Sequence, residues 1–499
     1  MLIFILSLLP IVIAVVLSLV TKRAVLSLLC GIFVGALILQ TFHPWKAILS
    51  VIEDYLIPSL ANEDNCKVIC FSLFVGATVE LMRLGGGTTA LVSMFSRFAN
   101  TRPKALVGTW FAGLTVFFDD YANCLIVGSS MQPITDAKKI SREKLAYLVD
   151  STAAPVATLA LVSTWIGYEV SLMEKALVVA GRDTNAYSFF LQGIPYRFYP
   201  ILALVFGFTI AASGRDFGPM LKAEQEAHEM EATDVDTNIS PNSYLSMALV
   251  PLILLIGVTF GDLYLQGIQS INNPDASLLE IIGAADGYNA MLHGSIASLL
   301  AAMLLCLFYG KTTEEIQNSC ISGTSRLMEA LLILACAWAL GDCIGDLKTA
   351  DHLISLLGNS INPSLLPSIV FVLAAGISFA TGTSFGTMGA LMPLALPLVL
   401  KMNVGIDIEL AVASAVLSGA TWGDHCSPIS DTTILSSAGS GCDHVAHVKT
   451  QLPYALVSGF IALLCCSLPI GFGLHWSFCL VLGVICCIGS IFVFGSKTQ

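Results

Sequence analysis

The sequence predicts an all-α polytopic membrane protein that contains an inverted repeat. Hydrophobic residues make up 56% of its 499 residues and charged residues only 12%, whereas about a quarter of a soluble domain is charged. Apolar stretches long enough to cross a bilayer recur along the chain. Polar residues interrupt four of these stretches near the middle, as in membrane folds with inverted repeats and discontinuous helices. We expect about eleven spanning helices.

Composition also narrows the class of protein. A mean hydropathy of +0.81 nearly excludes a soluble enzyme. The net charge of −12 comes without the basic patch that binds nucleic acid. The 15 cysteines lie mostly in apolar stretches, where cysteine behaves as a small hydrophobic residue. The first apolar run lacks a basic leader and a cleavage site, so it reads as a membrane helix and not as a signal peptide.

Residues 1–214 form the first predicted membrane half. Residues 105–135 have two apolar arms around the polar run FFDDYAN, and basic loops lie on both sides. Because cytoplasmic loops collect Lys and Arg, this segment should enter and leave from the cytoplasm as a re-entrant hairpin. A helix at 145–166 should be broken near the run DSTAAP, and an outer loop should follow it. Uninterrupted helices are expected at residues 2–20, 24–40, 66–84 and 189–212.

Residues 243–499 form the second predicted half, after an acidic segment, 215–242, that reads as a solvated cytoplasmic linker. A hairpin is expected at 366–400 around the run TGTSFGT, and a broken helix at 410–435. Threading the chain with basic loops inside makes the two hairpins enter from opposite sides. Uninterrupted helices are expected at residues 243–265, 293–309, 327–344, 455–471 and 477–494.

The last broken helix contains the run WGDHCSPISDTT, from Trp422 to Thr433, in the middle of an apolar span. An ionisable side chain in hydrocarbon costs about 2.5–3.5 kcal/mol on insertion scales and is tolerated where it faces a cavity or a partner. Pro428 frees backbone carbonyls, and irregular backbone at this depth occurs only where it lines protein or water. This run therefore predicts an unwound break that holds an ion.

The four breaks would together form one site. The candidate ion- or substrate-binding residues are Asp119, Asp120, Asn123, Asp150, Ser151, Thr152, Thr383, Ser384, Thr387, Asp424, Ser427, Ser430, Asp431 and Thr432. Hard cations prefer such oxygen ligands, and basic residues are nearly absent from the same segments. We expect Na⁺ at Asp150 and Asp424, with Asp120 next. One aspartate cannot hold a proton and Na⁺ at once, so their competition couples the two ions.

Several residues allow other interpretations. Asp119 is well placed to cap the second hairpin arm, and His425 fits a packing residue or a proton relay. The spacing of Cys442, His444 and His447 resembles a metal site, but these residues read as a solvated loop. A membrane hydrolase using His425 and Asp431 would lack a complete set of nucleophile, base and orienting group. Nothing resembles the ring-forming filter of a channel.

The run from Trp422 to Thr433, its continuation to Lys449, and the FFDDYAN and DSTAAP runs together resemble the NhaC-type Na⁺/H⁺ antiporter family, within the wider ion-transporter superfamily. The resemblance implies two re-entrant hairpins, two broken helices, a homodimer held by a scaffold half and an elevator-like movement of the transport half. It also implies mixed substrates, from simple Na⁺/H⁺ exchange to Na⁺-linked exchange of organic acids such as malate and lactate.

The sequence thus predicts a multi-pass antiporter of a bacterial inner membrane that exchanges Na⁺ for H⁺, without a cofactor and without enzymatic activity. The alternative is Na⁺- or H⁺-coupled transport of a small organic anion or an amino acid. An anion site would need basic side chains or helix N-termini. The scarcity of Lys and Arg in the four breaks favours the cation.

Overall fold

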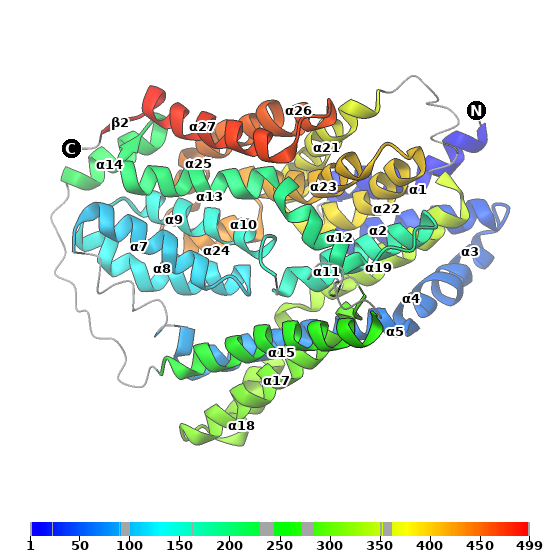
Figure 1. Cartoon of the computed structure of the whole chain (residues 1–499), viewed down its shortest axis with the longest axis horizontal. Coiled ribbons are helices and arrows are strands. Elements are labelled where there is room, and N and C mark those ends of the chain that lie inside the picture. Colours follow the sequence, from blue (N-terminus) through cyan, green and yellow to red (C-terminus); the bar gives the residue numbers. More distant parts are fainter. Residues whose placement is uncertain are drawn as a thin grey trace.

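The computed structural model describes residues 2–21, 23–88, 90, 100–161, 163–229, 244–271, 281, 284–349, 352 and 362–497. These residues are almost entirely helical, apart from one antiparallel pair of two-residue strands, β1 (Arg215–Asp216) and β2 (Ser496–Lys497). The strand pair joins the middle of the chain to its C-terminal end (Figure 1).

The helices up to the middle of the chain are α1 (Leu2–Thr21), α2 (Ala24–Leu39), α3 (Pro44–Ser50), η1 (Val51–Leu56), α4 (Ile57–Ala61), α5 (Glu63–Leu84), α7 (Arg102–Thr115), α8 (Asp120–Ala137), α9 (Arg142–Thr152), α10 (Ala154–Ala157), α11 (Thr164–Val179), α12 (Ala186–Gly193), η2 (Ile194–Tyr196), α13 (Phe198–Ser213) and α14 (Gly218–Glu229). Of these, η1 is a π-helix and η2 a 3₁₀-helix.

The helices after them are α15 (Ser246–Ser270), α17 (Gly287–Phe308), α18 (Thr313–Arg326), α19 (Met328–Asp346), η3 (Pro363–Leu365), α21 (Leu366–Thr381), α22 (Ser384–Met402), α23 (Ile406–Cys426), α24 (Asp431–Gly439), α25 (His444–Ile461), η4 (Ala462–Ser467), α26 (Leu468–Gly471) and α27 (Trp476–Phe494). A 3₁₀-helix, η3, leads into α21, and a π-helical segment, η4, joins α25 to α26.

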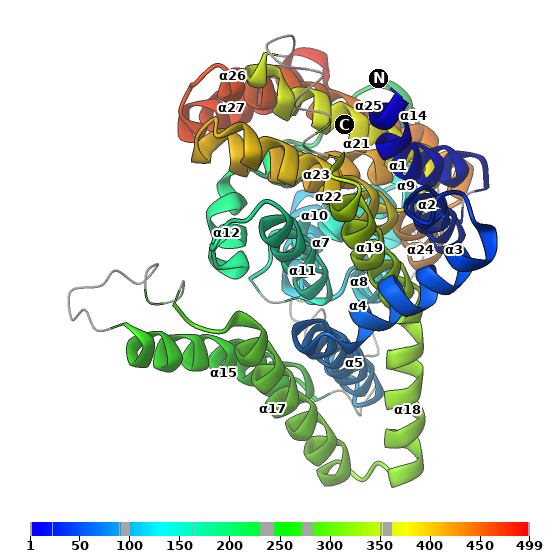
Figure 2. The same ribbon diagram turned by 90° about the vertical axis from the view of Figure 1, so that its right-hand side faces the viewer.

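Two groups of helices lie apart from each other. Helices α5, α15, α17 and α18 pack together as an arm, which stands away from the main body in Figure 2. The arm has a small core of its own, formed by Leu81, Met247, Ala302, Cys306 and Ile316. The large apolar core spans the body and also includes residues of the arm, among them Phe71 of α5, Leu252 of α15 and Met291 of α17. Helix α5 also contacts α11, and α18 contacts α19, so the arm is attached to the body through more than one helix.

Helix ends fall at the four polar interruptions. Residues 116–119 separate α7 from α8, and residues 382–383 separate α21 from α22. Helix α9 ends at Thr152 before the single turn of α10, and residues 427–430 separate α23 from α24. In Figure 1, α7 and α8 lie side by side near α9 and α24. The inverted repeat stays a prediction.

Short polar residues start the helices that follow the interruptions. Asp119 Oδ1 accepts a hydrogen bond from the N–H of Ala122 (2.7 Å) at the beginning of α8. Thr383 Oγ1 accepts one from the N–H of Gly386 (3.3 Å) at the beginning of α22. Such caps satisfy N–H groups that have no partner within the helix. Gly382, at φ 69°, ends α21 in the left-handed conformation that glycine adopts easily.

The number of spans is smaller among the described residues than the expected eleven. Six helices are long and apolar enough to cross a membrane, or eight if each of two bent helix pairs counts as one span. The arms α21 and α22 each reach this length, whereas α7 has only 14 residues. The total of about eleven therefore stays a prediction.

Some expected loops are helical. The outer loop expected after residue 166 is wrong, because α11 runs there as a largely buried helix. Helix α11 carries two charged residues, Glu169 and Lys175, and both have partners elsewhere in the chain. Glu169 is paired with Arg197 (2.7 Å) and Lys175 with Asp342 (2.6 Å). Helix α18 likewise replaces part of the loop expected before residue 327.

The acidic segment is not solvated throughout, because some of the residues in 215–229 are buried. Asp216 and Glu224 are both fully buried. Asp216 accepts hydrogen bonds from Lys144 Nζ (2.6 Å) and Tyr454 Oη (2.8 Å). Glu224 pairs with Arg102, and the N–H of Ser141 donates to its carboxylate (2.7 Å). Acidic residues that appeared to be solvated thus hold α14 against α7 and α9. The remainder of this segment lies outside the described residues.

Candidate ion-binding site

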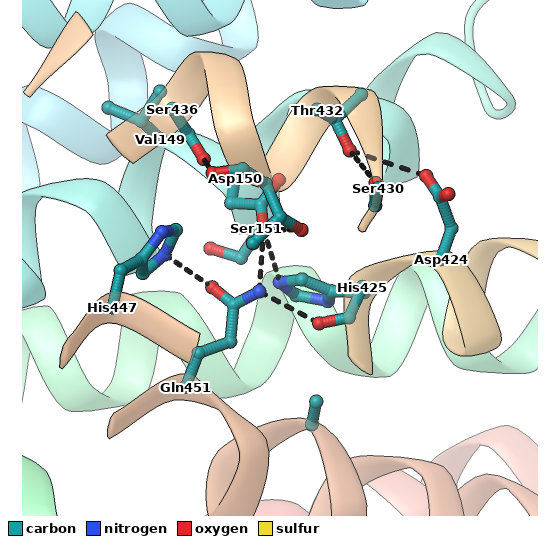
Figure 3. Close-up of polar contacts among 12 residues, drawn as sticks. Val149, Asp150, Ser151, Asp424, His425, Ser430, Thr432, Ser436, His447 and Gln451 are labelled. Carbon is teal, nitrogen blue, oxygen red and sulfur yellow. Dashed lines mark hydrogen bonds and ion pairs between the residues drawn. The ribbon is translucent and has the colours of Figure 1, made fainter. Parts of the chain in front are cut away.

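Asp150 stands at the C-terminal end of α9, just before the helix break at Ala153. Its side chain is 1% exposed. Asp150 Oδ2 accepts hydrogen bonds from Thr433 Oγ1 (3.0 Å) and Gln451 Nε2 (2.5 Å). Figure 3 shows Gln451 and His425 pointing toward this carboxylate. His425 Nε2 lies 3.9 Å from Asp150 Oδ2. Side chains from α9, α23, α24 and α25 therefore converge on one buried carboxylate.

Asp424 occupies the equivalent place at the end of α23, and it is 4% exposed. Thr432 Oγ1 donates to Asp424 Oδ2 (3.3 Å), and Thr432 shares a hydrogen bond with Ser430 (3.1 Å). These three side chains form the second polar group in Figure 3. The break between α23 and α24 thus surrounds Asp424 with hydroxyl groups.

The break of α7 and α8 contributes residues of different kinds. Asp119 caps α8, so the capping interpretation of this residue is correct. Asp120 is buried and lines a cavity. Asn123 Nδ2 donates to the carbonyls of Gly113 (2.7 Å) and Thr152 (2.9 Å), which ties this break to the end of α9. Asn123 Oδ1 is buried and has no hydrogen-bond partner among the described residues, so it is available to a cation.

Several other predicted residues bond the backbone. Ser384 Oγ donates to the carbonyl of Ala420 (3.3 Å), which joins the second hairpin to α23. Thr387 donates to the carbonyl of Thr383 (2.9 Å). Ser151 and Thr152 both donate to the carbonyl of Leu148, over 3.2 and 2.8 Å respectively. Their hydroxyl oxygens keep acceptor capacity, but the bonds observed here are structural.

Ser427 and Asp431 mark the two ends of the second helix break. Ser427 Oγ accepts from the N–H of Ile429 (3.3 Å) inside the unwound turn. Asp431 is more exposed than Asp424 and accepts a hydrogen bond from Tyr121 Oη (3.4 Å). This contact brings the first hairpin to the second broken helix. Hydrogen bonds therefore link all four breaks to one another.

A cavity of about 470 Å³ lies beside these breaks. The first hairpin contributes Asp120, the second contributes Thr383, and the second broken helix contributes Asp431. Two arginines, Arg23 and Arg326, also line it. They belong to neither a hairpin nor a broken helix, so counting basic residues within the four breaks missed them. The cavity therefore has both carboxylate and guanidinium groups on its walls.

The charge around Asp150 and Asp424 differs from that around other buried carboxylates. Glu169, Asp216 and Glu224 each have a lysine or arginine partner. Within the described part of the chain, neither Asp150 nor Asp424 has a lysine or arginine nitrogen within 4.0 Å. An uncompensated buried charge is strongly destabilising. A proton or a bound cation must therefore balance these two carboxylates.

Sequence reasoning missed the partners of Asp150. Thr433 is the last residue of the run that carries Asp424. It follows two candidate ligands, Asp431 and Thr432, and no other feature of the sequence pointed to it. Gln451 lies in α25, in a segment predicted to be a solvated loop. Tyr199 of α13, whose hydroxyl contacts His425 Nδ1 (2.6 Å), gave no signal either. These contacts depend on the packing of helices far apart in sequence.

Comparisons with known proteins agree with a transporter. A model of the Na⁺/H⁺ antiporter family matches residues 156–468. An uncharacterized protein of Haemophilus influenzae is 31% identical over 90% of this chain and 88% of its own length. The malate-2H⁺/Na⁺-lactate antiporter of Bacillus subtilis is 34% identical over 35% of this chain and 36% of its own. The YdaH transporter of Alcanivorax borkumensis has a similar fold, with a TM-score of 0.60, 16% identity and coverage of 88% and 89%.

Proposed function

Because the chain belongs to the Na⁺/H⁺ antiporter family and is a multi-pass membrane protein, we propose that it exchanges Na⁺ for H⁺ across the inner membrane of a bacterium. The observation that carries this proposal is the pair of buried carboxylates, Asp150 and Asp424, which have no lysine or arginine partner among the described residues. Each stands at a helix C-terminus, where the helix dipole favours a cation.

Na⁺ would take its ligands from the two carboxylates and the hydroxyl oxygens beside them. Thr433 now donates to Asp150, and Thr432 donates to Asp424. A hydroxyl that turns its hydrogen away can offer its oxygen to a hard cation. When Na⁺ leaves, a proton must neutralise the carboxylate again, because an isolated charge is costly in this interior. The same oxygens therefore serve both ions in turn.

We propose an elevator-type movement of the body relative to the arm. The arm, α5, α15, α17 and α18, stands out from the body and contains a small apolar cluster of its own in addition to its part in the large core, and we assign it the role of a scaffold. Helices α15 and α17 expose large apolar side chains, including Ile253, Leu265 and Leu304. Such faces suit lipid or a second copy of the chain, so a homodimer held by the arm belongs to this proposal. The inverted repeat of two re-entrant hairpins and two broken helices belongs to it as well.

The cavity favours one second candidate, an exchange that includes a small organic anion. Arg23 on its wall could hold a carboxylate, and Arg326, which pairs with Glu80 (3.0 Å), adds positive charge beside it. Helix α22, which begins at Ser384 beside the cavity, adds a helix N-terminus, where anions bind favourably. The Bacillus subtilis relative is named as a malate and lactate antiporter. If the organic anion takes part in the exchange, Arg23→Gln should weaken its transport and also the proton flux that requires it.

Proton flux in proteoliposomes tests both candidates. Purified protein would be reconstituted with an imposed pH gradient, and NaCl would be added alone or with organic acids and amino acids. Dissipation of the gradient by Na⁺ alone supports simple exchange. Flux that requires one organic solute supports the second candidate.

The variants Asp424→Asn and Asp150→Asn should abolish coupled exchange, since an amide cannot exchange a proton for Na⁺. Asp183→Asn, at an exposed position, is the matched control and should exchange as the wild type does. Full exchange by Asp424→Asn would remove Asp424 from the mechanism.

A further inference from the structure

A chain of hydrogen bonds leads from Asp150 toward the protein surface. Gln451 Nε2 donates to Asp150, and His447 Nε2 contacts Gln451 Oε1 (2.9 Å) (Figure 3). His447 Nδ1 then contacts Ser437 Oγ (2.8 Å), and Ser437 Oγ contacts His444 Nδ1 (3.1 Å). His447 is fully buried and His444 is partly exposed. The chain therefore connects the buried carboxylate to the surface through two imidazoles.

The outer partners fix which nitrogens carry hydrogen. Gln451 Nε2 also contacts the carbonyl of His425 (2.8 Å), which can only accept a hydrogen bond. The nitrogen of the Gln451 amide, and not its oxygen, must therefore face His425. Gln451 Oε1 then accepts from His447, whose Nε2 carries hydrogen. His444 Nε2 contacts the carbonyl of Pro428 (2.7 Å) and must carry hydrogen for the same reason. In both neutral imidazoles, Nδ1 is therefore an acceptor.

This arrangement leaves Ser437 with too few hydrogens. Its oxygen lies beside three acceptors, which are His447 Nδ1, His444 Nδ1 and the carbonyl of Thr433 (2.7 Å). A hydroxyl group has a single hydrogen to donate. One added proton serves both imidazoles, because an imidazolium Nδ1–H can donate to Ser437 Oγ while the serine hydrogen goes to the other imidazole. With this extra proton, a hydrogen lies between Ser437 Oγ and each imidazole.

We propose that His447, Ser437 and His444 form a proton-binding site that is coupled to Asp150 through Gln451. This inference rests on the proposed exchange of Na⁺ for H⁺ and adds a second place at which the exchanged proton is held. An amide group does not pass protons readily, so Gln451 transmits charge and not the proton itself. An anionic Asp150 polarises Gln451 and favours an imidazolium at His447. Na⁺ at Asp150 removes this effect.

The proton then leaves from the outer end of the cluster. His447 Nδ1–H gives its proton to Ser437 Oγ, and the serine hydrogen moves to His444 Nδ1. The resulting His444 imidazolium, which is partly exposed, then loses one proton to water and returns to its neutral form. Arg142 Nη1 donates to the carbonyl of Gly441 (2.9 Å), so this end lies beside the basic loop predicted to be cytoplasmic. His444 follows Asp443, which lines a surface cavity of about 380 Å³.

Other charged groups also face the cluster. Asp150 and His425 lie on its inner side. On its outer side, the charged residues around the surface cavity are Asp136, Lys139, Arg142, Glu143, Glu226 and Asp443. These outer groups are of both signs and are open to water. The buried Asp150 therefore dominates the field on the imidazoles.

The test is proton release on Na⁺ binding by the purified full-length protein in detergent micelles. A pH indicator in weakly buffered solution near neutral pH reports protons, and ²²Na⁺ reports binding. The wild type should release protons as Na⁺ binds. His447→Gln, Ser437→Ala and His444→Gln should bind Na⁺ but release about twofold fewer protons, or fewer still, per Na⁺ bound.

His293→Gln is the matched control, since His293 lies in the arm and pairs with Asp262; it should behave as the wild type does. His444 is partly exposed, whereas His447 is fully buried, so His444→Gln remains informative if His447→Gln fails to fold. An unchanged ratio of protons to Na⁺ in Ser437→Ala and His444→Gln would overturn the inference. A wild type that binds Na⁺ without releasing protons would instead contradict the proposed exchange itself, and with it this site.

Discussion

Thr433 Oγ1 donates a hydrogen bond to Asp150 Oδ2 over 3.0 Å, although 283 residues separate them in the chain. The contact joins the second broken helix to the first. It makes the two halves of the chain share one buried carboxylate. An ion bound at Asp150 should therefore affect the conformation of both helix breaks. A conformational change in either break should in turn alter the binding of that ion.

We expect Thr433→Val to weaken apparent Na⁺ affinity. Valine has the shape of threonine but removes the hydroxyl, both as a donor to Asp150 and as a ligand for Na⁺. Hydrogen bonds to charged groups contribute about 1.5–3 kcal/mol, so the Na⁺ concentration for half-maximal proton flux should rise about tenfold or more. Thr433→Ser should restore most of the loss.

The control for this prediction is Thr209→Val. Thr209 Oγ1 donates only to the carbonyl of Val205 in its own helix, α13. This variant should keep the Na⁺ affinity of the wild type. Equal affinities for Thr433→Val and Thr209→Val would show that the Thr433 hydroxyl has no part in binding Na⁺.

We expect Gly382→Ala to be costlier than Gly214→Ala. Both glycines are left-handed, at φ 69° and 61° respectively, and a side chain there costs about 1–2 kcal/mol. A Cβ at Gly214 would meet open space. A Cβ at Gly382 would lie 2.6 Å from the carbonyl oxygen of Ile429, within the second helix break. Gly382→Ala must therefore displace backbone beside the site.

Thermal unfolding in detergent and Na⁺-driven flux in proteoliposomes would compare the two variants. Gly214→Ala should show a small decrease in melting temperature with normal flux per folded protein. Gly382→Ala should show a larger decrease and reduced flux. If the two variants behave alike, the contact between the second hairpin and the second broken helix is not important for transport.

The positions of the helix breaks could be predicted because they violate local rules. Aspartates and Pro428 in the middle of apolar stretches have no place in a regular membrane helix. Asp150 and Asp424 were chosen for that reason, and both are buried at helix ends. Asp119 illustrates the limit of such reasoning, because a cap and an ion ligand need the same residue type at the same position.

Residues whose role depends on a distant partner could not be predicted. Glu169 of α11 is an isolated charge in the sequence, because its partner, Arg197, comes 28 residues later. Gln451 is an ordinary polar residue of α25 until α9 packs against it and brings Asp150 within 2.5 Å. Arg23 and Arg326 reach the cavity from outside the breaks. Only the packing of helices shows these relationships.

We expect Glu224→Gln to destabilise the protein at neutral pH. Burial alone would raise the pKa of Glu224, but Lys144 and Arg102 outweigh burial and hold the pKa below its ordinary value. Removing one partner of a buried ion pair costs about 3–5 kcal/mol. The melting temperature of Glu224→Gln in detergent should therefore fall clearly below that of the wild type at pH 7.

The loss of stability in Glu224→Gln should depend on pH. A carboxylate with a lowered pKa stabilises the folded state above its ordinary pKa, and the contribution is lost as the pH falls through the lowered value. The difference between wild type and Glu224→Gln should therefore be constant near neutrality and shrink in acid, below the ordinary pKa of glutamate. Glu226→Gln, on the exposed face of the same helix, should melt as the wild type does at every pH. A Glu224→Gln variant that melts with the wild type at pH 7 would show that α14 is not held by this ion pair.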